Sequence, residues 1–158
     1  MLCVNAVAFG AFGGVIGCAL NCTVEIPSPV ASESSRQRSE LAGQPAFVLH
    51  EHHKPRHHFD LRLEVDGVLR SWALPRGLPP DSAHDRLAVP VPDHEIEHLT
   101  YTDADKSIAD TGWWEQHDAN ERTTVFTLHG RNSDVRYALI NTGDDWLLHR
   151  VKAQQAGS

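Results

Sequence analysis

The sequence predicts an all-β protein, a small and mostly antiparallel β-barrel. Three observations lead to this fold class. Apolar and polar residues alternate from His57 to Val65, which is the period of a half-buried strand. The pair Asp66-Gly67 follows and is typical of a two-residue hairpin turn, because both turn positions need positive φ. Further short strand-like runs recur up to residue 151, and no stretch after residue 45 has a helical stripe.

The expected strands share short length, β-branched or aromatic residues and flanking turn residues. In chain order they are residues 47–52, 57–65, 68–74, 86–91, 111–115, 123–129, 134–140 and 145–151. Gly130, Asn132 and the run Asn141-Thr142-Gly143 separate the last three. Short strands at this spacing favour a small antiparallel barrel or sandwich.

The length of 158 residues suits one domain. Residues 1–44 are apolar and then rich in Ser and Pro, and we expect a poorly ordered extension outside the fold. Residues 45–152 are the expected barrel domain. An export or anchoring segment is the alternative for the apolar run, but no Lys or Arg precedes it. We therefore expect a cytoplasmic protein that does not contact a membrane.

The formal net charge of −7 excludes a basic protein that coats DNA. Any contact with nucleic acid must be local and salt-sensitive. The chain has 11 His, and imidazole is both a common metal ligand and a proton carrier near neutral pH. Cys3, Cys18 and Cys22 all precede the expected domain, so thiolates cannot provide its chemistry.

The hairpin brings polar side chains together on one face. With a two-residue turn, Arg62 faces Ser71, and His58 and Asp60 lie on the same side of their strand. His52 ends the preceding strand and can fold back beside His58. Two imidazoles and a carboxylate form a three-ligand site for Mn²⁺, Zn²⁺ or Fe²⁺. The alternative is that this face is only the solvated side of a sheet.

Other polar residues near this face have different expected roles. The planar guanidinium of Arg62 suits bidentate binding of a phosphate or carboxylate. His94 follows a strand end, where it could act as a general acid or a phosphate donor, or form only an exposed turn. Glu51, His53 and His57 are expected to be solvated surface or loop residues.

Three segments resemble the 3′-phosphoesterase domain of bacterial ligase D: residues 47–52, 58–64 and 66–77. The likeness covers roughly residues 46–150. It implies a metal-dependent β-barrel enzyme, typically with Mn²⁺, although Zn²⁺ or another divalent ion would fit. In that family the enzyme trims a terminal ribonucleoside from a 3′ end and removes the resulting 3′-phosphate. The implied substrates are 3′ ends of DNA or RNA–DNA strands, with a DNA ligase or Ku repair complex as partner and a monomeric chain.

The resemblance also implies roles for individual residues. His52, His58 and Asp60 match the metal ligands, and Arg62 and His94 match residues that act on the phosphate. The remaining polar positions match substrate contacts; they are Ser71, Arg76, Arg86, His50 and His98. Arg76 stands where Lys is usual, His50 where Gln is common and His98 where Tyr is common.

Two other functions stay open on the sequence. The family usually has an Arg-Asp pair and a Glu before the barrel, and no such motif is evident here. A catalytically weakened member that binds DNA ends or a repair partner is therefore one alternative. The pattern of two His and one Asp on a β-barrel also occurs in non-haem Fe²⁺ oxygenases, which is the other.

Overall fold

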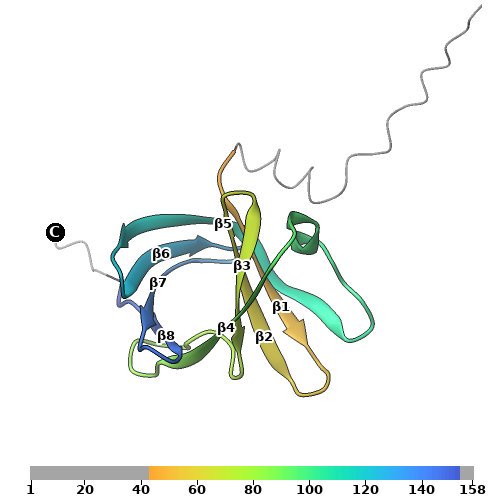
Figure 1. Cartoon of the computed structure of the whole chain (residues 1–158), viewed down its shortest axis with the longest axis horizontal. Helices are drawn as coiled ribbons and strands as arrows, with labels where there is room; N and C mark the ends of the chain where they lie inside the picture. Colours follow the sequence, from red (N-terminus) through yellow and green to blue (C-terminus); the bar gives the residue numbers. More distant parts are fainter. Residues whose placement is uncertain (1–42, 154–158) are drawn as a thin grey trace, which may run out of the picture.

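A computed structural model describes residues 43–153, which form a closed eight-stranded β-barrel with one short 3₁₀ helix (Figure 1). The elements in order are β1 (Ala46–His52), β2 (His58–Val65), β3 (Val68–Leu74), β4 (Arg86–His94), η1 (Ile96–Leu99), β5 (Lys106–Ala119), β6 (Thr123–His129), β7 (Asp134–Asn141) and β8 (Trp146–Arg150). Neighbours around the barrel are β1-β2-β3-β4-β8-β7-β6-β5, and β5 pairs antiparallel with β1 to close it. The predicted antiparallel all-β barrel is confirmed.

The extension predicted for residues 1–44 lies outside the described residues, apart from its last two positions. Within residues 43–153 no helix has the length and apolar character needed to span a membrane.

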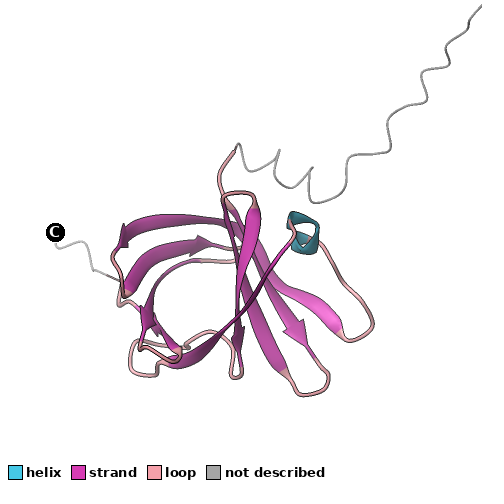
Figure 2. Cartoon of the chain, in the orientation of Figure 1, coloured by secondary structure: helices cyan, strands magenta, loops and turns pink. Residues whose placement is uncertain are grey.

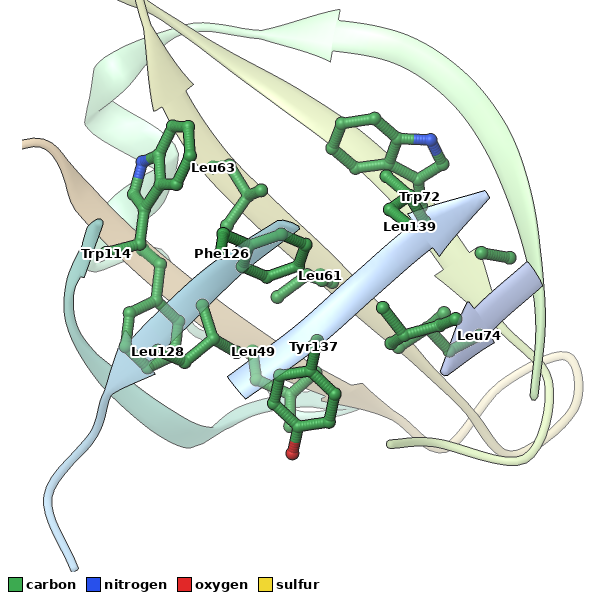
Figure 3. Packing of buried hydrophobic residues seen from close by; sticks show 13 residues of the cluster. Leu49, Leu61, Leu63, Trp72, Leu74, Trp114, Phe126, Leu128, Tyr137 and Leu139 are labelled. Carbon is green, nitrogen blue, oxygen red and sulfur yellow. The ribbon is translucent and has the colours of Figure 1, made fainter. Parts of the chain in front are cut away.

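Inward-pointing side chains of every second strand position fill the barrel (Figure 3). Leu61 and Phe126 are fully buried there, and Trp72 and Trp114 are nearly so. The remaining labelled members of this cluster are Leu49, Leu63, Leu74, Leu128, Tyr137 and Leu139. Because the interior is filled by side chains, functional groups must lie at its ends or on its outer wall.

A second, smaller apolar cluster lies on the outer wall of β1 and β3. Ala46, Val48 and Leu69 point outward, and Leu99 of η1 packs on them; all four are fully buried. Figure 2 shows this helical turn outside the barrel. The η1 segment therefore covers part of the outer wall, so polar residues of β1–β3 beside it are removed from solvent.

The β2–β3 hairpin has the predicted turn and register. Asp66 and Gly67 have φ of 51° and 82°, which fits the left-handed conformation that a tight hairpin turn needs. Arg62 pairs with Ser71, and every other pair of this hairpin also matches the two-residue turn. This register fixes which side chains share the outer face.

The prediction for β5 was wrong in length, since the strand covers Lys106–Ala119 rather than residues 111–115. Its sequence is polar and Gly-containing, which hides a strand from a hydrophobic pattern. Its first half pairs with β1 and its second half with β6, with register shifts at Leu49/His50 and Gln116/Asp118. These irregularities bend a long strand around the barrel. His94 is also within β4, as its last residue, instead of beyond a strand end.

Gly112 occupies a point of close backbone approach, where β5 passes from β1 to β6. A Cβ at this position would overlap the backbone carbonyl oxygen of His129. We expect Gly112→Ala to lower the free energy of unfolding by about 2 kcal/mol or more, measured by urea denaturation. Ser107→Ala, an exposed change on the same strand, is the control. Equal stability of the two variants would contradict the close approach.

Candidate functional site

Neighbouring positions of β1, β2 and β3 bring the predicted polar residues together on the outer wall. His50 pairs with Asp60, and His52 pairs with His58. Arg62 is 1% exposed and Asp60 is 7% exposed. A charged pair is rarely buried to this extent without a specific arrangement of partners.

His52, His58 and Asp60 converge as the sequence predicts. Nε2 of His52 lies 3.1 Å from Oδ2 of Asp60, and Nε2 of His58 lies 3.7 Å from Oδ1. The two rings stack with centroids 4.6 Å apart. One ligand atom from each residue lies within 4.8 Å of the others, so small side-chain movements bring all three to about 2.1 Å from a single ion.

The protonation of the two imidazoles fits a cation. Nδ1 of His58 donates to the carbonyl of Arg56 at 2.8 Å, which leaves the lone pair on Nε2, the nitrogen that faces Asp60. Nε2 of His52 is buried and has no hydrogen-bond partner among the described residues. Burial lowers the pKa of His52, which favours the neutral ring that metals bind. These three residues therefore fit a divalent metal ion.

The guanidinium of Arg62 is held by three neighbours. Its Nη2 donates to Oδ2 of Asp60 at 2.9 Å, its Nη1 to Oγ of Ser71 at 3.0 Å, and its Nε to Nδ1 of His50 at 3.2 Å. Ser71 in turn donates to the carbonyl of Leu69. Three of the five N–H groups of the arginine thus have partners among the described residues, and two are left for a substrate.

His50 holds the guanidinium of Arg62 through a hydrogen bond. The residue is fully buried, and its Nδ1 accepts from Arg62 while Nε2 donates to the carbonyl of Tyr101 at 3.0 Å. Burial, with the charge of Arg62, lowers the pKa of His50 to about 3. Because both ring nitrogens are engaged within the protein, His50 positions the guanidinium in this structure; a direct phosphate contact stays a prediction.

This low pKa predicts acid sensitivity. Unfolded His50 takes up a proton below pH 6.5, whereas the folded residue stays neutral until about pH 3. The unfolded state then binds more protons, so stability falls as the pH falls from 6.5 toward 3. We expect His50 to account for a loss of about 2 kcal/mol between pH 7 and pH 5.

His50→Gln tests this directly, because an amide can also accept from Arg62 and donate to Tyr101. We expect the free energy of unfolding of the variant to depend less steeply on pH below 6.5, with close to one proton fewer taken up on unfolding. Urea unfolding at several pH values, with a metal chelator present, measures this slope. The remaining slope comes from His52, His94 and His98, whose pKa values burial also lowers. An unchanged slope would contradict a neutral His50.

His94 and His98 complete one side of the site. Nδ1 of His94 lies 3.4 Å from Oγ of Ser71, and the rings of His94 and His98 meet edge to face at 4.9 Å. Burial first, and then the charge of Arg62, lowers the pKa of both imidazoles. The structure therefore brings both residues to the Arg62 cluster, which consists of Arg62 and its hydrogen-bond partners His50, Asp60 and Ser71.

Arg76 and Arg86 have a different setting. They line a hollow of about 230 Å³ together with Asp85, and no member of the Arg62 cluster lines it. Arg76 is exposed, and Nε of Arg86 is buried without a hydrogen-bond partner in the described part of the chain. Their role as substrate contacts stays a prediction.

Sequence reasoning missed Lys106. This residue pairs with His52 across β1 and β5, and its Nζ lies 4.8 Å from the centroid of the Tyr101 ring. Burial and the charge of Arg62 lower the pKa of Lys106. It lines a hollow of about 590 Å³ beside the metal ligands, with His52, Lys54, Pro55, Asp103, Ala104 and Asp105. The predicted strand began at residue 111, whereas β5 begins at Lys106. An earlier predicted start would have placed Lys106 in a strand and made its position beside a neighbouring strand apparent.

Comparisons with known proteins identify the family of the chain. The family model for the DNA ligase D 3′-phosphoesterase domain matches residues 50–141. A multifunctional non-homologous end joining protein LigD of Mycolicibacterium smegmatis is 40% identical over 150 residues, which is 82% of this chain and 19% of that protein. The LigD protein of Mycobacterium tuberculosis strain H37Rv is 41% identical over 123 residues, covering 69% of this chain and 16% of that protein.

A more distant relative, LigD of Pseudomonas aeruginosa, is 31% identical over 142 residues, which is 78% of this chain and 17% of that protein. The chain thus spans less than a fifth of the length of these relatives. The matched segment contains all the predicted site residues from His50 to His98. By the extent of this match, the chain belongs to the DNA ligase D 3′-phosphoesterase domain family.

Proposed function

We propose that this chain is a divalent-metal-dependent phosphoesterase that removes 3′-phosphates and 3′-terminal ribonucleotides from DNA ends during end joining. The observation that carries the proposal is the pair of imidazoles, His52 and His58, set around Asp60 beside the buried guanidinium of Arg62. Family membership and the end-joining function in the names of the relatives support it. A DNA ligase or Ku complex is the partner that this function implies.

The three ligands would hold the ion, with Mn²⁺ the ion proposed. When bound, it supplies positive charge for the phosphate oxygens and acidifies a water molecule.

The protein's own groups bind and orient the phosphate. Arg62 donates its two remaining N–H groups to non-bridging oxygens, and it is already held in place by His50, Ser71 and Asp60. A donor fixed before the reaction costs no reorganisation as charge develops. His94 lies against Ser71, and its lowered pKa keeps the imidazole neutral at pH 7. We assign it as the proton carrier at the reacting phosphate.

The direct test uses the purified full chain with Mn²⁺ and an oligonucleotide that ends in a 3′-phosphate. A second substrate ends in a single 3′ ribonucleotide. We expect release of inorganic phosphate from the first, shortening of the second, and loss of both in His58→Ala. No reaction on either substrate would overturn the proposal. Tight end binding that His58→Ala leaves unchanged would instead favour the non-catalytic end-binding module.

Lys106 is expected to hold the DNA strand that leads into the site. Its ammonium group lies half-buried at a hollow that adjoins His52, where a backbone phosphate would gain from the charge. We expect Lys106→Met to raise KM about fivefold with a small change in kcat. The slope of the logarithm of the binding constant against the logarithm of the salt concentration should also fall in magnitude by close to one.

Lys54→Met is the matched control, because Lys54 lines the same hollow but is 75% exposed and pairs with Asp105. Its expected effect on KM is less than twofold, since an exposed pair contributes little. Equal effects of the two substitutions would contradict a specific role for Lys106.

A further inference from the structure

We propose that Glu51, His53 and His57 form a second divalent-cation site, separate from the His52–His58–Asp60 site and suited to a borderline ion such as Zn²⁺. The three residues lie at the end of the β1–β2 hairpin, where the sequence alone predicts only solvated groups. One ligand atom from each lies within 4.8 Å of the others. The site does not depend on the proposed function.

The side chains already converge. Nε2 of His57 lies 2.6 Å from Oε1 of Glu51. The rings of His53 and His57 are stacked, with centroids 5.7 Å apart and an interplanar angle of 17°. The ring of His57 also packs edge-on against Phe59 at 5.1 Å. Two imidazoles therefore lie side by side next to one carboxylate.

The backbone around these side chains is fixed by the fold. Glu51 pairs with Phe59 in the β1–β2 ladder, and the amide of His53 donates to the carbonyl of Asp105 at 2.9 Å. Both ends of the loop that joins His53 to His57 are thus anchored. A cation needs only small side-chain rotations to close the site, so little ordering entropy opposes binding.

The two candidate sites use alternate positions of the same hairpin. His52, His58 and Asp60 point to the covered outer wall, whereas Glu51 shares the opposite face with Phe59. The Asp60 carboxylate is shared with the Arg62 guanidinium at 2.9 Å, and Lys106 adds positive charge nearby. The Glu51 carboxylate faces His57 instead. The loop of the second site also carries two cations, Lys54 and Arg56, and the charge of Lys54 is paired with Asp105 at 3.2 Å.

The donor set determines which ions fit, and it is the same donor set as at the His52–His58–Asp60 site. Two imidazole nitrogens and one carboxylate oxygen suit Zn²⁺, Ni²⁺ or Cu²⁺, and the same donors bind Mn²⁺ more weakly. A divalent ion would take the place of the proton between His57 and Glu51. It would also link the end of β1 to the loop that precedes β2. His58 is the first residue of β2.

The test is the number of Zn²⁺ ions bound by the full chain, measured by equilibrium dialysis against a chromophoric chelator. The triple variant Cys3→Ser, Cys18→Ser and Cys22→Ser removes binding by thiolates and serves as the background. In it we expect two equivalents of Zn²⁺. Adding His53→Gln and His57→Gln to this background should weaken Zn²⁺ binding at the Glu51 site at least tenfold. Only one equivalent of Zn²⁺ should then remain bound.

Two controls make the count specific. His84→Gln removes an exposed imidazole that pairs with Asp81 at 2.8 Å and should leave two equivalents. Asp60→Asn should remove the other equivalent and leave the Glu51 site occupied. The His53→Gln and His57→Gln pair should still release phosphate with Mn²⁺. An unchanged Zn²⁺ count in this pair, with a normal thermal unfolding profile, would overturn the second site.

Discussion

Replacing Asp60 with asparagine is expected to reduce phosphate release by a factor on the order of 10³ and to abolish metal binding at the His52–His58–Asp60 site. The two carboxylate oxygens face different ligands, with Oδ2 near His52 and Oδ1 near His58. An amide has the same shape but no charge, and its NH₂ group repels a cation. Metal content after dialysis and phosphate release are the two measurements.

Glu64→Gln is the matched control for this prediction. Glu64 is another buried carboxylate of β2 on the outer wall, and its Oε2 accepts from the amide of Ala46. The same loss of charge there should leave the metal content unchanged. If Asp60→Asn retained both the metal and the activity, the proposed ligand set would be wrong.

Arg62→Met is expected to lower the free energy of unfolding by about 3 kcal/mol and to remove phosphate release. The substitution leaves the nearly buried Asp60 carboxylate without its guanidinium, and it removes the donors to Ser71 and His50. A stranded buried charge costs more than a lost neutral hydrogen bond. Urea unfolding with a metal chelator present measures the stability without any contribution from bound ions.

A double-mutant cycle separates the ion pair from simple packing. In the Asp60→Asn background no carboxylate is left without a partner, so Arg62→Met should cost clearly less than in the wild type. Arg62→Lys keeps the charge but loses the planar fork, and it should also lose most of the activity. Equal costs of Arg62→Met in both backgrounds would show that the pair has no coupling.

Much of the barrel follows from local patterns. The Asp66-Gly67 turn fixes the register of β2 and β3, and the pairing of Arg62 with Ser71 follows from it. The extent of β5 does not, because its first residues are polar and are held in place by pairing with β1. Such a strand is specified by its neighbours rather than by its own alternation.

Some of the site residues could likewise be placed from the sequence, and others could not. His58, Asp60 and Arg62 share a face because strand side chains alternate, and this was predictable. The burial of His50 was not, since it depends on the Tyr101 carbonyl and on η1, which cover the outer wall from a distant part of the sequence. The position of Lys106 beside His52 likewise needs the β1–β5 register.

Closure of the barrel also limits how the protein can recruit other molecules. Each of the eight strands has a hydrogen-bonded neighbour on both sides over part of its length. Residues 106–112 of β5 pair only with β1, and residues 89–94 of β4 pair only with β3, so β-augmentation within residues 46–150 is confined to these two short edges. Where both sides of a strand are paired, the template on which foreign strands nucleate amyloid-like stacks is removed. Elsewhere on the barrel, binding of another macromolecule must rely on side chains and connecting loops, whose sequences can change without disturbing the cylinder beneath them.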